Sequence, residues 1–380
     1  MELYLDEAAT TKLNDKVKEE YENLLSSFYG STGSLHSLGT KSLELEVKAR
    51  SKIASLLKVK ENEILFNSGA TEGNNFAIKG TAFSYKNRGN TIITTKVEHP
   101  SVLEACKQLE EDFNFNVIYL DVDSDGVVDL NMLSKSMSND VILVSIMYVN
   151  HELGTIMPME KINKIVRQYP KAILHSDITQ AIGKIDVNLS LVDIATMSAH
   201  KIHGLKGSGF MYKKEKVNLY PLISGHPATN QMRAGTSNFL ANIVLANTLS
   251  LALIKQKEEY SKTLQIKIKV LDKLKMIDNV VVNSTIDNSI PNTINFSLPG
   301  YNSEVIIRAM SSKGIYLSSK SVCSLSKKDA TSTTLAAMKK DIDVATSSIR
   351  ISYDASFSDD KIDYFISSLQ DVISATKRSQ

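Results

Sequence analysis

The chain alternates short apolar segments with amphipathic ones between about residues 17 and 254, and this rhythm limits its fold more than any other feature. Apolar runs of four to nine residues rich in β-branched side chains are typical of buried strands, and the segments between them have helical periodicity. Strands separated by helices predict a mostly parallel sheet that is covered on both faces. The expected strands are residues 63–66, 91–94, 117–120, 141–149, 172–176, 194–197 and 209–212.

The rhythm changes after a long, lysine-rich helical segment expected at residues 241–276. Short strands expected at residues 292–297, 315–317 and 348–352 lie among helices there, which is typical of an α+β domain. The chain has 380 residues, and single hydrophobic cores seldom serve more than about 250–300 residues. We therefore predict a large α/β domain at residues 13–255 and a smaller α+β domain made of residues 1–12 and 256–380.

Composition excludes several classes of protein. The 44 basic and 42 acidic residues nearly balance, which argues against a nucleic-acid partner. Two cysteines that lie far apart, Cys106 and Cys323, fit a reducing compartment and exclude a disulfide scaffold or a multi-cysteine zinc site. The start of the chain lacks a basic, then apolar, leader, and the run at residues 141–149 is about half the length of a membrane span. We expect a cytoplasmic protein that does not act at a membrane.

A lysine and an aspartate each follow an expected strand. Asp177 comes directly after residues 172–176, and Lys201 comes shortly after residues 194–197. In α/β proteins, binding sites form at the carboxyl ends of parallel strands. A lysine amine can form a Schiff base with an aldehyde, and a carboxylate can keep a pyridine nitrogen protonated so that the ring accepts electrons. The pair therefore predicts a site for pyridoxal 5'-phosphate.

The segment Asn67-Ser68-Gly69-Ala70-Thr71-Glu72-Gly73 follows the first expected strand and opens a helix. Free backbone N–H groups around Ala70 and the hydroxyl of Thr71 would lie at the positive end of that helix, which suits a phosphate. An ordinary helix cap would explain the same residues. The lysine and the aspartate farther along favour the phosphate.

Three more polar residues follow expected strands. His99 could stack on a planar ring and transfer protons near neutral pH, although an isolated histidine is more often structural. Asn150 and Gln180 could form hydrogen bonds with a ring hydroxyl. Arg350 lies inside an apolar strand, where it would serve as a clamp for a carboxylate or as one half of an internal salt bridge.

The surroundings of the two cysteines differ. Cys106 lies in a helical pattern with apolar residues three and four positions apart, which predicts a place in the core. Cys323 lies at residues 318–340, a stretch rich in serine, threonine and lysine, whose first half we expect to be an exposed, mobile loop. Because cysteine is usually buried, a thiol on such a loop suggests chemistry. His200 and His203 have a spacing that could suggest a metal, but beside Lys201 they fit a cofactor site better.

Taken together, these motifs resemble the cysteine desulfurase family, the pyridoxal-phosphate enzymes related to class V aminotransferases. The likeness extends over nearly the whole chain. The matching motifs are Tyr4-Leu5-Asp6-Glu7-Ala8-Ala9-Thr10-Thr11, Ser34-Leu35-His36, Ser68-Gly69-Ala70-Thr71-Glu72, Glu98-His99, Asn150-His151-Glu152-Leu153-Gly154, Asp177-Ile178-Thr179-Gln180, Ser198-Ala199-His200-Lys201, Met232-Arg233-Ala234-Gly235-Thr236, Cys323 and Ser347-Ser348-Ile349-Arg350.

The resemblance implies a fold type I transferase, in which a large domain with a mostly parallel seven-stranded sheet precedes a smaller α+β domain. It also implies that Lys201 holds the cofactor covalently, that Asp177 pairs with the pyridine nitrogen and that His99 stacks on the ring. Asn150 and Gln180 would address the phenolic oxygen. The residues expected around the phosphate are Ala70, Thr71, Ser198, His200 and, from the partner subunit of a homodimer, Thr236.

For the substrate, the resemblance implies L-cysteine, with its carboxylate on Arg350 and Asn150 close by. The Cys323 thiolate would attack the substrate sulfur, leaving L-alanine and a persulfide. The long spacing between Cys323 and Arg350 is similar to that of family members that pass sulfur to scaffold or transfer proteins for iron–sulfur clusters or thionucleosides. We expect such an acceptor protein here.

Several positions depart from the family pattern. His151 stands where a second asparagine is common, and Lys320 stands where a glycine usually precedes the thiol by three residues. Leu205, Ser31-Thr32 and residues 224–231 also differ. Two other functions stay open: an aminotransferase or selenocysteine lyase that does not need Cys323, and a catalytically weak scaffold that binds partners through the basic residues 320–328.

Overall fold

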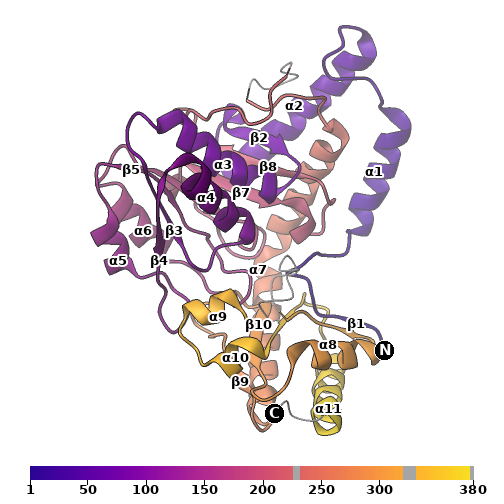
Figure 1. Ribbon diagram of the computed structural model, residues 1–380. Coiled ribbons are helices and arrows are strands. Elements are labelled where there is room, and N and C mark those ends of the chain that lie inside the picture. Colours follow the sequence, from indigo (N-terminus) through magenta and orange to yellow (C-terminus); the bar gives the residue numbers. More distant parts are fainter. Residues whose placement is uncertain (226–231, 320–330, 377–380) are drawn as a thin grey trace.

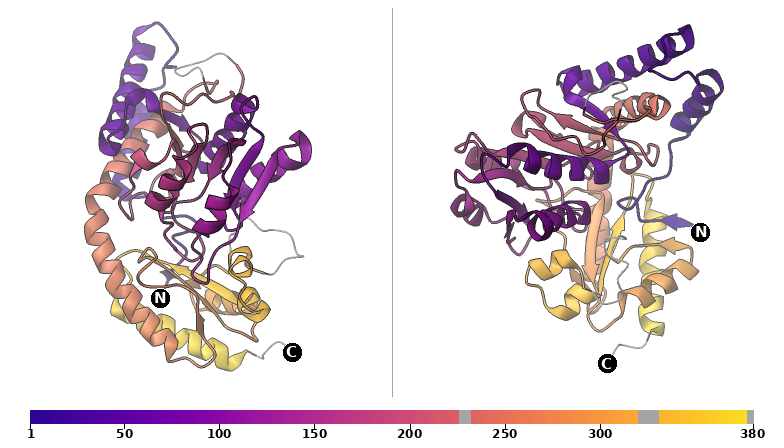
Figure 2. Two further views of the ribbon diagram at one scale, coloured as in Figure 1. Left: turned by 90° about the vertical axis from the view of Figure 1, so that its left-hand side faces the viewer. Right: turned by 45° about the horizontal axis from the view of Figure 1, so that its top comes forward.

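The structure is a computed structural model that describes residues 1–225, 232–319 and 331–376. It has a larger body built on one sheet and a smaller body that contains both ends of the described chain (Figure 1). Helix α7 (Phe239–Lys275) runs through both bodies, and side views show it curving along one side of the molecule (Figure 2).

The larger body contains a seven-stranded sheet with the strand order β2-β8-β7-β6-β5-β3-β4. Strand β8 is antiparallel to both of its neighbours, and the other neighbouring pairs are parallel. The expected mostly parallel sheet is therefore confirmed. Its strands are β2 (Ile64–Asn67), β3 (Thr91–Thr95), β4 (Asn116–Leu120), β5 (Val141–Ser145), β6 (Ile173–Asp177), β7 (Ile194–Ser198) and β8 (Gly209–Lys213).

One expected strand is too long. The run at residues 141–149 predicts a single strand, but β5 ends at Ser145. Beyond it, the N–H of Met147 donates to the buried carboxylate of Glu98, and Val149 pairs with Ile156 in a local loop. The apolar composition continues because the loop is buried, and burial alone does not distinguish a strand from a packed loop.

Successive residues of each central strand point to opposite faces of the sheet, and each face has its own core. Ile92 of β3 and Ile173 of β6 pack with α3 (Ala70–Tyr85) and α4 (Pro100–Phe113). Their neighbours in sequence join the core on the other face, where the helices are α2 (Ser37–Leu57), α5 (Leu130–Ser136), α6 (Met159–Val166) and the first part of α7. Strands buried on both faces explain why these segments are apolar throughout.

The smaller body has a separate core. Strands β9 (Val281–Val282), β10 (Thr293–Ser297) and β12 (Ser348–Ser352) form an antiparallel sheet, and β1 (Leu3–Tyr4) pairs in parallel with β11 (Ile315–Tyr316). The helices here are α8 (Ser303–Ser312), α9 (Thr333–Ala337), α10 (Ile342–Thr346) and α11 (Asp359–Ala375). The two-residue strands β1 and β9 are too short to leave a sequence pattern. The boundaries at residues 12 and 255 stay a prediction, because α7 is continuous.

Helix α7 is long and apolar enough, by length and composition alone, to cross a membrane. Its most apolar 18-residue window has a mean hydropathy of 1.4, and half of that window is buried inside the protein. It packs against α2 and against α1 (Asp15–Ser27), which joins the larger body from the N-terminal side. A single such helix is weak evidence for a membrane span, because the core helix of a globular protein has the same composition.

Helix α7 also buries a lysine. Lys267 is fully buried, and its ammonium group donates to the hydroxyl of Ser289 and to the carbonyl of Ile290. Burial lowers the pKa of Lys267 to about 7 from 10.5. These contacts tie α7 to the segment before β10, because both acceptors lie in that segment.

We predict that Lys267 makes the stability of the fold depend on pH. Since the pKa is lowered in the folded state, the unfolded chain binds more protons between pH 7 and 10.5, and stability rises with pH across that interval. From pH 7 to pH 9 the wild type should gain about 2 kcal/mol in free energy of unfolding relative to Lys267→Met. Urea denaturation at both pH values measures this difference, and parallel pH dependence of the two proteins would contradict it.

Candidate active site

The carboxyl ends of β5, β6 and β7 meet at one edge of the sheet because the three strands are parallel. Asp177 is the last residue of β6, and Ser198 is the last residue of β7. The short 3-10 helix η3 (Ala199–Lys201) follows at once and carries Lys201. Two other 3-10 turns, η1 (Glu61–Glu63) and η2 (Leu189–Leu191), precede β2 and β7. The structure thus brings the aspartate and the lysine to the same edge, as their positions after strands predict.

The N-terminal arm, which we define as residues 6–11, holds the lysine segment. The Lys201 ammonium group donates to the carbonyl oxygens of Ala8 and Ala9, each at 2.6 Å. Thr11 donates both its N–H and its hydroxyl to the carbonyl of His200, each at 2.9 Å. Sequence reasoning used this arm only as a sign of resemblance and missed its role, since carbonyl contacts depend on backbone position rather than residue type.

Asp177 and His99 belong to one hydrogen-bond network. Asn74 of α3 donates to the Asp177 carboxylate at 2.7 Å and to the Ser101 hydroxyl at 2.9 Å. Ser101 in turn lies 2.8 Å from Nδ1 of His99, and the N–H of Thr179 donates to the other Asp177 oxygen. The network fixes the carboxylate and the imidazole relative to each other. Asn74 and Ser101 were missed because polar residues inside helices carry no distinctive pattern.

His99 also has the structural role that the sequence leaves open. Its Nδ1 accepts the N–H of Ser101 at 3.1 Å and so caps α4. Burial lowers the pKa of His99, and the positive charge of Lys201 adds to this, although Asp177 opposes it. The ring is therefore held in place and favoured in its neutral form.

A cavity of about 330 Å³ lies at the N-terminus of α3. It is lined by Thr71 of α3, by Ser198 and His200 of the lysine segment, by Lys206, and by Glu72, whose negative charge is paired with Arg233. The Ser198 hydroxyl accepts the N–H of Ala70 at 2.7 Å. Backbone N–H groups, hydroxyls and a cation around one cavity suit an anion. The structure thus gathers four of the residues predicted to surround a phosphate, and adds Lys206.

Gly69 allows the strand to approach this helix end. Its φ of +136° lies outside the range of ordinary side-chain-bearing residues, and a Cβ at Gly69 would lie 3.0 Å from the Ser198 hydroxyl. Nearby, the hydroxyl oxygen of Thr10 lies 3.1 Å from Nδ1 of His200. Burial and the charges of Lys201 and Lys206 lower the pKa of His200 to about 4, so its imidazole is neutral.

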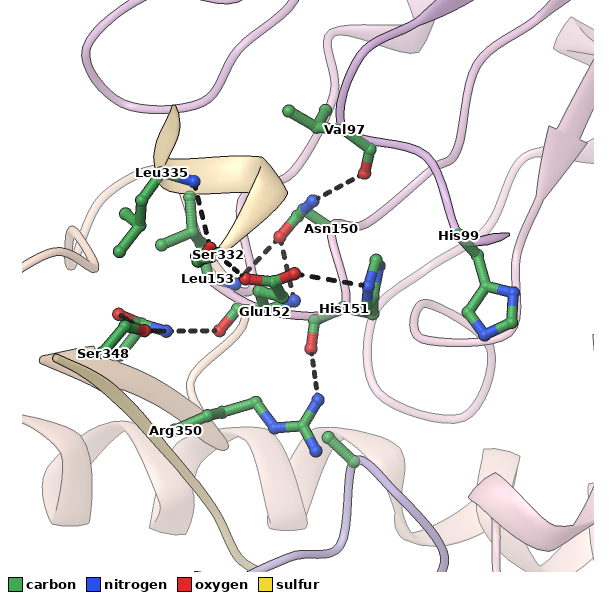
Figure 3. Close-up of polar contacts among 12 residues, drawn as sticks. Val97, His99, Asn150, His151, Glu152, Leu153, Ser332, Leu335, Ser348 and Arg350 are labelled. Carbon is green, nitrogen blue, oxygen red and sulfur yellow. Dashed lines mark hydrogen bonds and ion pairs between the residues drawn. The ribbon is translucent and has the colours of Figure 1, made fainter. Parts of the chain in front are cut away.

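Asn150 and Gln180 lie close to the edge but already have partners within the protein. Gln180 donates to the carbonyl of Ala8 at 3.0 Å and accepts from Lys184 at 2.6 Å. Asn150 donates to the carbonyl of Val97 and accepts the backbone N–H groups of Glu152 and Leu153 (Figure 3). Their contacts with a ring hydroxyl stay a prediction.

Arg350 is buried in β12, and the structure shows the internal salt bridge that the sequence allows. One terminal nitrogen donates to Asp6 at 2.8 Å. The other donates to the carbonyl of His151 at 2.9 Å (Figure 3). Its Nε has no hydrogen-bond partner among the described residues. The guanidinium thus faces the N-terminal arm and the loop after β5, and its buried Nε–H can still donate to a ligand.

Of the remaining predicted residues that the structure describes, Thr236 does not join this group. Thr236 lines a different cavity of about 260 Å³, together with Glu46 and Arg50. Cys323 and the whole basic stretch at residues 320–328 lie outside the described residues, as do residues 226–231 of the variant segment 224–231. Cys106 is fully buried, which confirms its predicted place in the core, and burial raises the pKa of its thiol.

Comparisons with known proteins agree with this geometry. The sequence model named Aminotransferase class-V matches residues 3–365. Cysteine desulfurase IscS of Dictyoglomus turgidum is 37% identical over 375 residues, which cover 98% of this chain and 94% of that one. A solved structure of a NifS-like protein covers 99% of this chain and 100% of its own, with 34% identity and a TM-score of 0.93. A solved structure of SspA in complex with cysteine covers 92% and 98%, with 27% identity and a TM-score of 0.80.

The fold, the lysine-bearing edge and the matching family model place the chain in the aminotransferase class-V family. Within that class, the chain belongs to the cysteine desulfurase family. It shares the fold of the NifS-like protein over almost its full length.

The buried contact between Asp6 and Arg350 leads to a prediction about stability. Asp6→Ala would leave the guanidinium without a counter-charge, and the free energy of unfolding should fall by about 2–3 kcal/mol. Asp6→Asn keeps an oxygen acceptor and should lose less. Chemical denaturation of the three proteins measures the order, and an Ala variant as stable as the wild type would show that the pair contributes nothing.

Proposed function

We propose that this chain is a pyridoxal-phosphate-dependent cysteine desulfurase that removes sulfur from L-cysteine, giving L-alanine and a persulfide on Cys323. One observation carries the proposal. Lys201 and Asp177 lie at the same strand edge, next to a cavity suited to an anion, in a chain of the cysteine desulfurase family.

The residues present fit the cofactor. A phosphate group would find the N-terminus of α3, the hydroxyls of Thr71 and Ser198, His200 and Lys206 around one cavity. Ala70 would contribute its N–H, which donates to Ser198 in this structure. Thr236 would complete this set from the partner subunit, since it lines another cavity of its own chain.

The ring would be placed by three side chains. Asp177 would hold a proton on the pyridine nitrogen, because Asn74 and Thr179 keep its carboxylate fixed at the edge. His99 would cover one face of the ring, and Lys201 would hold the aldehyde carbon covalently. Asn150 and Gln180 would lie beside the phenolic oxygen. When bound, the cofactor supplies an electron sink that makes the Cα–H of the amino acid acidic.

The chain's own residues then account for the reaction. Arg350 binds and orients the substrate carboxylate, and Asn150 lies nearby. The Lys201 amine would remove the proton from Cα. The Cys323 thiolate forms a bond to the substrate sulfur while the Cβ–S bond breaks. The electron pair of the broken bond stays with Cβ. Protonation of Cβ and return of the proton to Cα give L-alanine, and a persulfide is left on Cys323.

We further propose a cytoplasmic homodimer that passes its sulfur to an acceptor or scaffold protein for iron–sulfur cluster or thionucleoside synthesis. Large apolar side chains are exposed along α1, α2 and the loop between them, which supports a subunit contact there. They include Leu25, Tyr29, Leu35, Leu38 and Val47. In Figure 1 these two helices stand out from the rest of the larger body.

The role of Cys323 is testable by substitution. Cys323→Ala should lower alanine formation from L-cysteine at least about 100-fold, because no other residue in the proposed reaction supplies the nucleophile. The visible absorption of the bound cofactor should remain. Cys106→Ala is the matched control, since that thiol is buried in the core, and it should keep its turnover. A Cys323→Ala enzyme with full turnover would instead indicate an aminotransferase or a lyase.

The dimeric site is testable by mixing subunits. Lys201→Ala and Thr236→Ala homodimers should each be impaired. In a mixed dimer, one site would combine the intact Lys201 of one subunit with the intact Thr236 of the other. Co-expression should therefore restore activity in the mixed dimers, up to about one site in two. No recovery, with mixed dimers present by mass spectrometry, would contradict a site that is shared between subunits.

A further inference from the structure

His151 lies between two residues of the proposed site. Its ring centre is 5.5 Å from that of His99, and the rings are close to perpendicular. Its backbone carbonyl accepts a hydrogen bond from Arg350 at 2.9 Å. Figure 3 shows the imidazole of His151 between Glu152 and His99, with Arg350 below the same loop. The proposed function gives this histidine no role.

The His151 imidazole is buried and neutral. The residue is 8% exposed, and Nδ1 has no hydrogen-bond partner among the described residues. Burial lowers the pKa of His151 well below 6.5, and the nearby charges of His99, Arg350 and Lys201 lower it further. A buried polar atom without a partner costs free energy, so an unpaired nitrogen next to a binding site suggests a contact made by a ligand.

The surrounding carboxylate orients the ring. Nε2 of His151 lies 3.8 Å from one oxygen of Glu152, and the other oxygen accepts the hydroxyl of Ser332, which caps α9. A carboxylate on this side favours the tautomer with hydrogen on Nε2. Nδ1 is then a hydrogen-bond acceptor rather than a donor.

We propose that His151 contacts the substrate directly, with Nδ1 accepting a hydrogen bond from the ammonium group of an α-amino acid whose carboxylate is bound by Arg350. This inference rests on the proposed function. The ammonium and carboxylate groups share one carbon atom, so an acceptor for the ammonium group must lie close to the guanidinium. The backbone carbonyl of His151 contacts Arg350, and the His151 imidazole is near enough for the charge of Arg350 to lower its pKa. A neutral acceptor suits an ammonium group, whereas a charged imidazolium would repel it.

His151 therefore selects for the amino group of the substrate. Loss of the acceptor should weaken binding of amino acids and raise KM, with a smaller effect on kcat, because the contact forms before chemistry. Asparagine at this position can place an amide oxygen near the site of Nδ1. Glutamine places its amide near the site of Nε2 and leaves Nδ1 unreplaced.

Binding of two probes to the borohydride-reduced holoenzyme tests the inference, because the reduced lysine–cofactor bond cannot exchange with the amino group of a probe, which therefore stays an ammonium group. L-alanine carries both the carboxylate and the ammonium group, whereas 3-mercaptopropionate carries the carboxylate and lacks the ammonium group. By calorimetry, His151→Leu and His151→Gln should weaken L-alanine about tenfold or more, the loss typical of a hydrogen bond to a charged group. His151→Asn should stay within about threefold of the wild type. None of the three should change the affinity for 3-mercaptopropionate.

Two results would overturn the inference. Unchanged L-alanine binding in both the Leu and Gln variants would show that Nδ1 makes no contact with the substrate. Equal weakening of both probes would show that His151 acts only by holding Arg350. Failure of the proposed function would look different, because the wild-type holoenzyme would then form no alanine from L-cysteine.

Discussion

Parallel pairing of β5, β6 and β7 is the constraint on which the rest of the site depends. The register pairs Ser176 with Ala195 and Asp177 with Thr196, so β6 and β7 end at the same edge. Backbone hydrogen bonds along both strands fix this alignment, and the cores on the two faces would be lost if it slipped by one residue. The carboxylate of Asp177 and the lysine segment after Ser198 are thus placed by the sheet rather than by contacts between them.

The N-terminal arm connects this edge to the smaller body. Ala8 donates its N–H to the Ser352 hydroxyl of β12 at 2.8 Å, while its carbonyl accepts from Lys201 and Gln180. Asp6 pairs with Arg350 on the same strand, β12. A single short segment therefore holds the residue proposed to bind the cofactor and the residue proposed to bind the substrate carboxylate. Movement of the smaller body would change both sets of contacts together.

Much of the fold and part of the site could be predicted from the sequence, for a physical reason. Strands buried on two faces must be apolar, so the sheet leaves a clear pattern, and Asp177 and Lys201 stand out because they come at or just after the ends of apolar strands. The carbonyls of Ala8 and Ala9 leave no pattern, since every residue has one. Asn74 and Ser101 look like ordinary polar residues of helices until the fold brings them next to Asp177. The expected strand continued past the true end of β5 because Met147 is apolar. Met147 is apolar because it is buried in the core, and not because it pairs with a neighbouring strand.

The central claim is that Lys201 binds the cofactor covalently, and borohydride reduction of the holoenzyme tests it most directly. Reduction makes the bond between the lysine and the cofactor permanent, and peptide mapping by mass spectrometry then locates the added mass. We expect the cofactor adduct on the peptide that contains Lys201, and no adduct on that peptide in the Lys201→Ala variant. An adduct on another lysine, such as the neighbouring Lys184 or Lys206, or no adduct in enzyme that has bound the cofactor, would contradict it.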